Sequence, residues 1–231
     1  FFFQAEEGIR DPLWSRGLGD VYKRQVFFLP IDFIYLVLLG VIIGLFAELY
    51  SKYVLAMQDL GKRWYKNKFI LKMSICGLLL GSIYSFLPSS FHNLDELQKI
   101  IAEKNTSIEI ALLAVFILFI TTGLAAASGA PGGLFYPMLT LGAAIGLIMG
   151  SWVEIATGHA PSTYIFAGMG AFVAGCSRTP ITAMFLAFAL TKNLLIMKPV
   201  LISCITSFLV ARAFNEKSIY ERQIQIELEE L

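Results

Sequence analysis

The stretch AASGAPGGLFYPMLTLGAAIG, residues 126–146, combines polar and bendable residues with the start of a hydrophobic segment. A helix that begins near Leu134 inside such a segment leaves its first N–H groups without intrahelical acceptors, at the positive end of the helix dipole. Gly132 and Gly133 carry no side chains that would keep an ion away from these amides, and Pro137 lies in the first turn, where a missing N–H costs little. The pattern therefore predicts an anion site made of backbone amides. The same glycines also suit close packing of helices in a membrane, and this alternative stays open here.

The serine in this stretch suggests a second chemistry. Residues 126–129 read AASG and are similar to the GxSG motif of rhomboid-like intramembrane proteases, although Ala126 stands at the position of the first glycine. A nucleophile at Ser128 needs a histidine base within hydrogen-bond distance. The histidines His92 and His159 both lie in polar segments rather than in apolar ones. We expect no enzyme, and keep a serine protease as an alternative that labelling of Ser128 by a fluorophosphonate would support.

Composition places the chain in a membrane. Hydrophobic residues make up 57% and charged residues 15% of the chain, against roughly a quarter charged in soluble domains, and the mean hydropathy is +0.70. The net charge of +1 comes without a dense basic block, so we expect no nucleic-acid partner. Cys76, Cys176 and Cys204 lack the spacing of metal ligands, and we expect them to be small buried apolar residues. No metal and no cofactor are predicted.

The first 25 residues, FFFQAEEGIRDPLWSRGLGDVYKRQ, differ sharply in character from the apolar run that begins at Val26. They are polar, have no helical period and lack the order of basic, apolar and small residues that marks a signal peptide. The stretch resembles translated sequencing-adapter read-through. We interpret residues 1–25 as a non-native artefact, with a genuine cytoplasmic arm as the alternative, and we expect the native gene to continue upstream.

Several apolar segments occupy the rest of the chain, and some are too short to cross a membrane, which takes ~20 helical residues for the ~30 Å hydrocarbon layer. Short, Gly/Pro-interrupted segments indicate discontinuous helices that meet near the bilayer midplane, where irregular backbone must be buried in protein or line a cavity. We therefore predict an all-α, multi-pass integral membrane protein with tilted and discontinuous helices. The segments are 31–50, 69–87, 108–125, 134–156, 163–176, 180–191 and 196–214.

Charges between the segments predict an orientation. The loop expected after the first segment is basic, whereas residues 88–107 carry mixed charges. Because basic loops stay in the cytoplasm, the first loop should be cytoplasmic, and counting crossings leaves the C-terminus there too. The basic loop contains Lys52, Lys62, Arg63, Lys66, Lys68 and Lys72 against Glu48 and Asp59.

Four stretches resemble the CLC family of chloride channels and proton-coupled chloride antiporters. SGAPGGLFYPMLTLGAAIG is similar to the family's GxFxP signature and the small-residue helix after it. LVLLGVIIGLFAELYSKYVLAMQDL resembles the helix that opens the second inverted repeat, YIFAGMGAFVAGCSRTPITAMFLAFALT resembles the paired late helices, and IYERQ resembles the segment with the central tyrosine. The resemblance covers about residues 31–231. It implies a CLC-type inverted-repeat fold of which residues 26–231 are the second half only, the C-terminal half of the transmembrane domain.

The resemblance also implies a site and a function. The amides of Leu134 and Phe135 would coordinate chloride, with Gly132, Gly133 and Pro137 as supporting backbone, and Tyr220 would donate its hydroxyl from the other side. A tyrosine at the membrane interface is the alternative for Tyr220. The implied function is chloride transport as part of a channel or a proton-coupled antiporter, in a plasma or bacterial inner membrane, with chloride as transported ligand and no cofactor.

Departures from the family pattern limit these expectations. Tyr136 replaces the small residue usual in the signature, and Ala189 stands where an acidic residue is common. The family's GSGxP element and the GxEGP element with the gating glutamate do not occur in this sequence. We therefore expect a missing N-terminal half as partner and no transport by this chain alone, with channel and antiporter undecided. A different half-helix transporter for an anionic substrate remains the alternative, and the resemblance implies a homodimer formed through residues 163–191 and 196–214.

Overall fold

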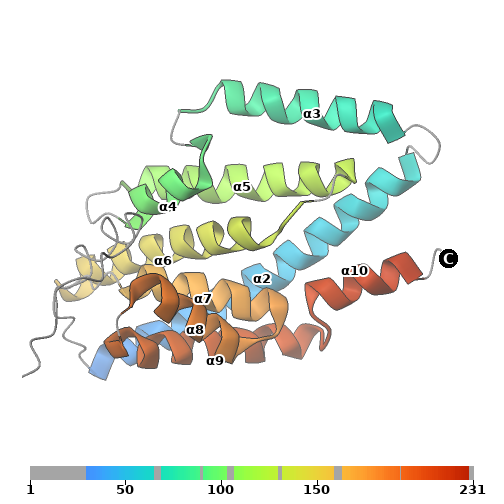
Figure 1. The fold of residues 1–231 in the computed structure, drawn as a ribbon. Helices are drawn as coiled ribbons and strands as arrows, with labels where there is room; N and C mark the ends of the chain where they lie inside the picture. Colours follow the sequence, from blue (N-terminus) through green and yellow to red (C-terminus); the bar gives the residue numbers. More distant parts are fainter. Residues whose placement is uncertain are drawn as a thin grey trace, which may run out of the picture.

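The computed structural model describes residues 30–64, 69–88, 91–102, 107–129, 132–158, 163–192 and 194–228. The stretch interpreted as an artefact and His159 lie outside these residues. All regular elements in the described part are helices (Figure 1). They are α2 (Pro30–Trp64), α3 (Phe69–Ser85), α4 (Leu94–Ala102), α5 (Ile108–Ser128), α6 (Phe135–Thr157), α7 (Thr163–Ser177), α8 (Pro180–Thr191), the 3-10 turn η2 (Leu194–Ile196), α9 (Met197–Phe214) and α10 (Ile219–Leu228).

Six of the seven expected segments coincide closely with single helices, but the first does not. The prediction that it ends at residue 50 is wrong, because α2 continues for 35 residues to Trp64. The extension keeps an apolar face, with Val54 and Leu55 buried, and an i,i+4 ion pair between Arg63 and Asp59 at 2.8 Å supports its last turns. The charges of residues 48–63 therefore belong to a helix and not to a loop. At roughly 50 Å, α2 is longer than the hydrocarbon layer, so it must tilt or protrude.

The segment 88–107, expected to be a loop, contains the helix α4. Its apolar residues lie on one side, with Leu97 and Ile101 fully buried, four residues apart on one helix face. Gln98 Nε2 donates to Thr140 Oγ1 of α6 at 2.9 Å. Because the segment is short and its other face is polar, its hydropathy did not distinguish it from a loop.

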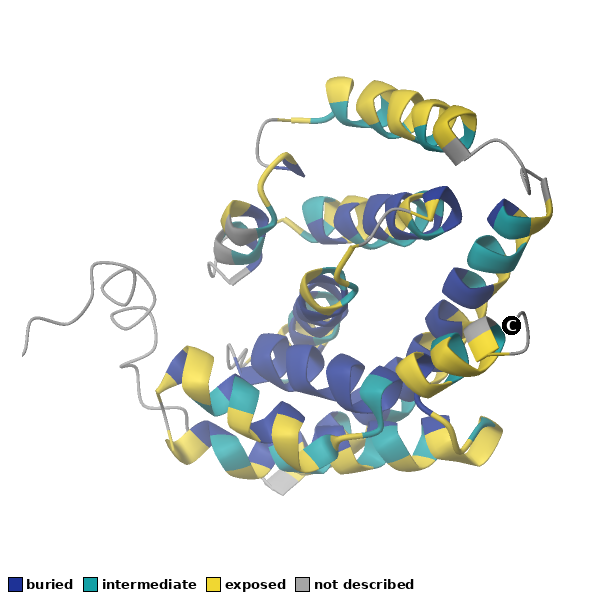
Figure 2. Cartoon of the chain, turned by 45° about the vertical axis from the view of Figure 1, so that its right-hand side comes forward, coloured by how far each residue is buried: buried dark blue, intermediate teal, exposed yellow. Residues whose placement is uncertain are grey.

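The core is centred on α7, which is buried along nearly its whole length and packs against α6, α9 and α2. Figure 2 shows it in almost continuous dark blue. Small residues make this possible: a Cβ at Gly168 would collide with the carbonyl oxygen of Gly142, and one at Gly146 with that of Tyr164. The backbones of α6 and α7 therefore touch directly, as is common where helices pack in membranes.

Buried hydroxyls connect three helices across the core. Ser203 Oγ of α9 donates to the Leu36 carbonyl of α2 at 2.9 Å, and Ser207 Oγ donates to the Ala171 carbonyl of α7 at 2.7 Å. Since apolar surroundings offer no water, each hydroxyl needs such a protein acceptor. These bonds fix α9 against both α2 and α7.

Among the residues that the structure describes, four helical stretches are long and apolar enough to cross a membrane: Ile31–Arg63, Ile108–Ser128, Phe135–Thr157 and Leu194–Ile226. The last of these includes the break between α9 and α10. Ile70–Ser85, Thr163–Ser177 and Pro180–Thr191 are apolar but shorter. The expectation of short apolar helices beside full-length ones is thus confirmed.

Candidate anion site

The start of α6 presents backbone donors. α5 ends at Ser128, Gly129 follows in the left-handed conformation (φ 71°), and α6 begins at Phe135, preceded by Leu134 with φ −81°. The Leu134 carbonyl accepts the first helical bond from Met138 at 3.1 Å. Pro137 has no N–H, so the amides of Leu134, Phe135 and Tyr136 are the donors that the helix itself leaves free. The predicted helix start near Leu134 is confirmed.

The approach to these amides is open. A Cβ placed at Gly133 would meet no atom within 4 Å, and Gly132 is exposed as well. Phe135 is 37% and Tyr136 52% exposed, their rings meeting edge to face at 6.2 Å. Close helix packing therefore does not explain Gly133 within the described residues, whereas it does explain Gly142 and Gly146. Close packing thus accounts for Gly142 and Gly146, and the role of Gly133 beside an anion stays a prediction.

Tyr220 is the second residue of α10, and its position depends on the cap of this short helix. The Ser218 N–H donates to Glu221 Oε2 at 2.6 Å, and the Glu221 N–H donates to Ser218 Oγ at 3.2 Å. This reciprocal pair is a capping box. Tyr220 is 40% exposed, and its hydroxyl makes no hydrogen bond to the described part of the chain.

Tyr220 and the α6 amides come from elements that share two packing partners. α10 packs on α2 and α7, and α6 packs on α2, α4, α5 and α7. No hydrogen bond joins the tyrosine to Leu134 or Phe135 among the described residues. Both donors are free and partly exposed, so each has capacity for a ligand.

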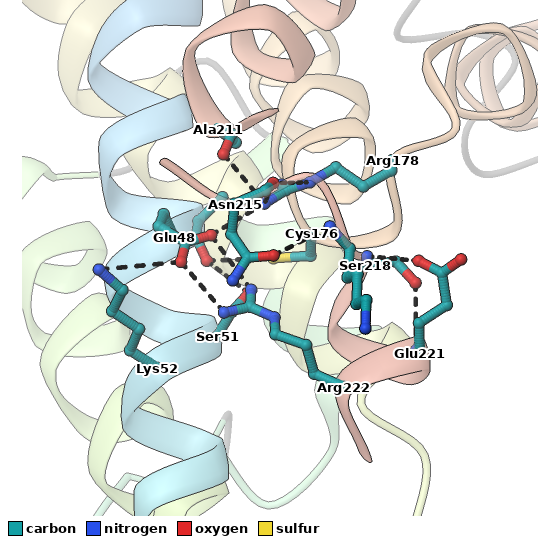
Figure 3. Close-up of polar contacts among 12 residues, drawn as sticks. Glu48, Ser51, Lys52, Cys176, Arg178, Ala211, Asn215, Ser218, Glu221 and Arg222 are labelled. Atoms are coloured by element: carbon teal, nitrogen blue, oxygen red, sulfur yellow. Dashed lines mark hydrogen bonds and ion pairs between the residues drawn. The ribbon is translucent and has the colours of Figure 1, made fainter. Parts of the chain in front are cut away.

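Beside Tyr220 lies a buried charge cluster that the sequence analysis missed. Glu48 in α2 is only 3% exposed. Arg178 Nη2 lies 2.8 Å from its Oε2, and Arg222 donates from Nη1 to Oε1 at 3.0 Å and from Nη2 to Oε2 at 3.1 Å. Lys52 Nζ stands 4.0 Å from Oε1. Figure 3 shows the carboxylate enclosed by these cations.

The cluster joins distant parts of the chain. Arg178 follows α7 with φ 63°, and its Nη2 also donates to the carbonyls of Ala211 and Asn215 at the end of α9, both at 3.0 Å. A buried carboxylate is costly unless it is paired and hydrogen-bonded. Burial of Glu48 therefore depends on Arg178 and Arg222, and the carbonyls at the end of α9 hold Arg178 in place. The sequence signal was a single acid within the apolar run LFAELY, and an ionisable residue inside a span is by default a functional candidate.

Other predicted residues have more ordinary places. Cys176 and Cys204 are buried as expected, whereas Cys76 is half-buried, because α3 packs mainly on α5 and leaves its other face open. Within the described residues no group of His, Cys, Asp or Glu could hold a metal ion. Ser128 is buried at the end of α5, where its hydroxyl donates to the Ala125 carbonyl at 2.7 Å, and His92 is exposed with its ring near Tyr84.

Comparison with known proteins places this arrangement in one family. The family model described as voltage gated chloride channel matches residues 15–212, a range that includes the α6 start but not Tyr220. The chain is 31% identical over 191 residues to the H(+)/Cl(-) exchange transporter ClcA of Vibrio parahaemolyticus, covering 80% of this chain and 41% of the relative. It is 32% identical over 203 residues to ClcA of Klebsiella pneumoniae, covering 85% and 43%.

Solved structures give the same result for the fold. A slow cyanobacterial Cl−/H+ antiporter superposes with a TM-score of 0.78 at 26% identity, covering 93% of this chain and 52% of that one. A eukaryotic CLC transporter superposes with a TM-score of 0.72 at 23% identity, covering 90% and 37%. The chain spans about two fifths of the length of these curated relatives, and its helices form a partial CLC fold. On this evidence the chain belongs to the voltage-gated chloride channel family.

Proposed function

We propose that this chain supplies part of the anion site of a chloride transporter, with chloride held by the amides of Leu134 and Phe135 and by the Tyr220 hydroxyl. The observation that supports this most directly is the start of α6, where the helix leaves its first N–H groups without acceptors and a Cβ at Gly133 would meet no atom within 4 Å. Gly132, Gly133 and Pro137 serve as the supporting backbone. The names of the curated relatives, H(+)/Cl(-) exchange transporter, favour proton-coupled exchange over passive conduction for the whole protein.

Neutral donors suit transport better than a fixed cation does. A monovalent anion must bind well enough to enter a site and weakly enough to leave it. Amides and a phenol provide partial charges, whereas a free guanidinium would hold the ion too long. The arginines Arg178 and Arg222 are instead engaged by Glu48, which fits a site from which the ion can escape.

Leu134→Pro tests the amide directly in the full-length protein. Its φ of −81° is close to that of proline, the preceding glycine imposes no Cβ clash, and the lost N–H has no helical acceptor. Leu134→Ala is the matched control that keeps the amide. Hydrogen bonds to charged partners contribute enough that chloride affinity, measured by titration calorimetry, should fall about tenfold in the proline variant. Equal affinities in the two variants would count against the proposal, and preference for an organic acid over chloride would favour another anion transporter.

Four further parts of the proposal concern the whole protein. We infer that it also contains a first repeat that completes the site, that it lies in a plasma or bacterial inner membrane, and that its C-terminus is cytoplasmic. The basic residues at the end of α2, among them Lys62 and Arg63, support this orientation. Apolar side chains exposed on α8 and α9 support a homodimer: Ile181, Phe185, Leu190, Ile205 and Leu209.

A further inference from the structure

We propose that Glu48 and Arg222 are positioning residues for Tyr220, an inference that rests on the proposed function. Tyr220 belongs to a helix of ten residues, too short to be stable alone. The two hydrogen bonds of its capping box lie within residues 218–221, so they order the start of the helix but do not fix the helix against α2 and α7. Something outside α10 must therefore fix where its tyrosine points.

The residues of α10 that make that connection lie on one face: Ile219, Arg222 and Ile226, of which Ile226 packs against the core while partly buried. Ile219 is fully buried, and Arg222, three residues later, is 11% exposed in its side chain. Residues three apart are neighbours on a helix surface. α10 is thus held against α2 and α7 along one line, by an apolar contact and by the Arg222–Glu48 pair.

The geometry of the Arg222–Glu48 pair restricts rotation of α10 about its own axis. Two parallel N–H···O bonds, at 3.0 and 3.1 Å, join the guanidinium fork to both carboxylate oxygens. Such a bidentate pair constrains orientation as well as distance. Glu48 is itself held by Arg178, so the acceptor is rigid.

Fixing Arg222 against Glu48 also fixes the direction of Tyr220. Tyr220 is 40% exposed, yet it interacts electrostatically with Tyr50 of α2 and Cys176 of α7, which are both fully buried. Its side chain therefore lies beside the same two helices that hold Arg222. If the fork is lost, the apolar contacts of Ile219 and Ile226 still hold α10, but they fix its rotation less strictly than two directional hydrogen bonds do, and the hydroxyl no longer points to one place.

The test is a double-mutant cycle on chloride affinity in the full-length protein. Arg222→Gln should weaken chloride binding about fivefold and Tyr220→Ala about tenfold. The double variant should bind chloride no more weakly than Tyr220→Ala alone, because Tyr220→Ala already removes the hydroxyl that Arg222 would position. Effects that multiply would overturn the inference, since Arg222 would then act on the ion independently of the tyrosine.

Two control variants distinguish an effect of the Tyr220 position from an effect of the positive charge near Glu48. Lys52→Gln removes a cation from the same carboxylate at 4.0 Å without touching α10, and chloride affinity should stay unchanged. Arg222→Lys keeps the charge but loses the fork, and should behave like Arg222→Gln. An Arg222→Lys variant with normal affinity would refute a positioning role.

A measurement made without chloride also tests whether Arg222 orients Tyr220. With 3-fluorotyrosine at position 220, the fluorine signal should shift or broaden in Arg222→Gln and not in Lys52→Gln. An unchanged signal, with only a lower melting temperature, would leave Arg222 a purely structural residue. Should Tyr220→Ala alone leave chloride affinity intact, the proposed ligand is wrong, and the fluorine signal still decides whether Arg222 orients Tyr220.

Discussion

At the scale of single residues, the arginines next to α10 are paired with a carboxylate, and the donors proposed for the anion are uncharged. Arg178 and Arg222 both bind Glu48, whereas the proposed donors are amides at the start of α6 and a phenol near the start of α10. A buried carboxylate is expensive by itself. Here it holds two arginines in place, and in the proposed site the anion would be bound by uncharged donors only.

The open position at Gly133 gives a residue-scale prediction. Gly133→Val adds a side chain where no atom lies within 4 Å, so the melting temperature of the full-length protein should not change. Chloride affinity should fall about tenfold, because the new methyl groups occupy the approach to the Leu134 and Phe135 amides. Calorimetry and a thermal-shift assay measure the two quantities, and normal chloride binding would contradict the assigned approach.

At the scale of helices, the α6–α7 contact depends on missing side chains. Gly168→Val should destabilise the protein by about 1–3 kcal/mol or more, since its Cβ would meet the Gly142 carbonyl of the facing helix. Gly150→Ala is the graded control, because its nearest neighbour is a side-chain atom, Tyr164 Cβ, at 3.2 Å. The fraction of protein that stays monodisperse after heating measures the difference in stability between the two variants. Equal losses in both variants would argue against direct backbone contact between α6 and α7.

Most helices were predictable because hydrophobicity sets their limits. The starts of α6 and α8 coincide with Gly and Pro signals, and the apolar runs end where polar residues begin. The extension of α2, the helix α4 and the helix α10 were not predicted, since these are amphipathic or polar and owe their burial to tertiary contacts.

Of the candidate site, too, some parts were predictable from local sequence and others were not. The α6 amides follow from local sequence, because a helix start depends on neighbouring residues. The partners of Glu48 lie 130 and 174 residues away, and no local pattern identifies them. The role of Tyr220 as a ligand stays a prediction that came from the family resemblance.

At the scale of the whole molecule, this chain alone should not carry chloride. Purified and reconstituted into liposomes, residues 26–231 should give no flux above that of empty vesicles, whereas the full-length protein should. The α6 amides face an open side in this chain, and polar backbone cannot remain exposed to lipid. A chloride electrode measures efflux, and substantial efflux from the chain alone would refute a site shared between two repeats.

The dimer prediction also belongs to this scale. Cysteine at Phe185, 54% exposed on α8, should crosslink two copies of the full-length protein in a background with Cys76→Ala and with any cysteine outside this chain replaced. Within this chain the background keeps the buried Cys176 and Cys204. Cysteine at Leu78 is the control, since it is exposed on α3, at the opposite edge of the molecule from α8 (Figure 1). Crosslinks at Leu78 but not at Phe185 would place the subunit contact elsewhere.

The Glu48 cluster has a consequence for how the protein is made. Glu48 leaves the ribosome 174 residues before Arg222, which at common rates of synthesis is roughly 9–35 s. During that interval α2 enters the membrane with a carboxylate whose final partners do not yet exist. Lys52, one turn away, is present from the beginning and offers a temporary counter-charge at the membrane surface. Arg222 of α10 thus supplies the last partner of a carboxylate that belongs to the first helix described.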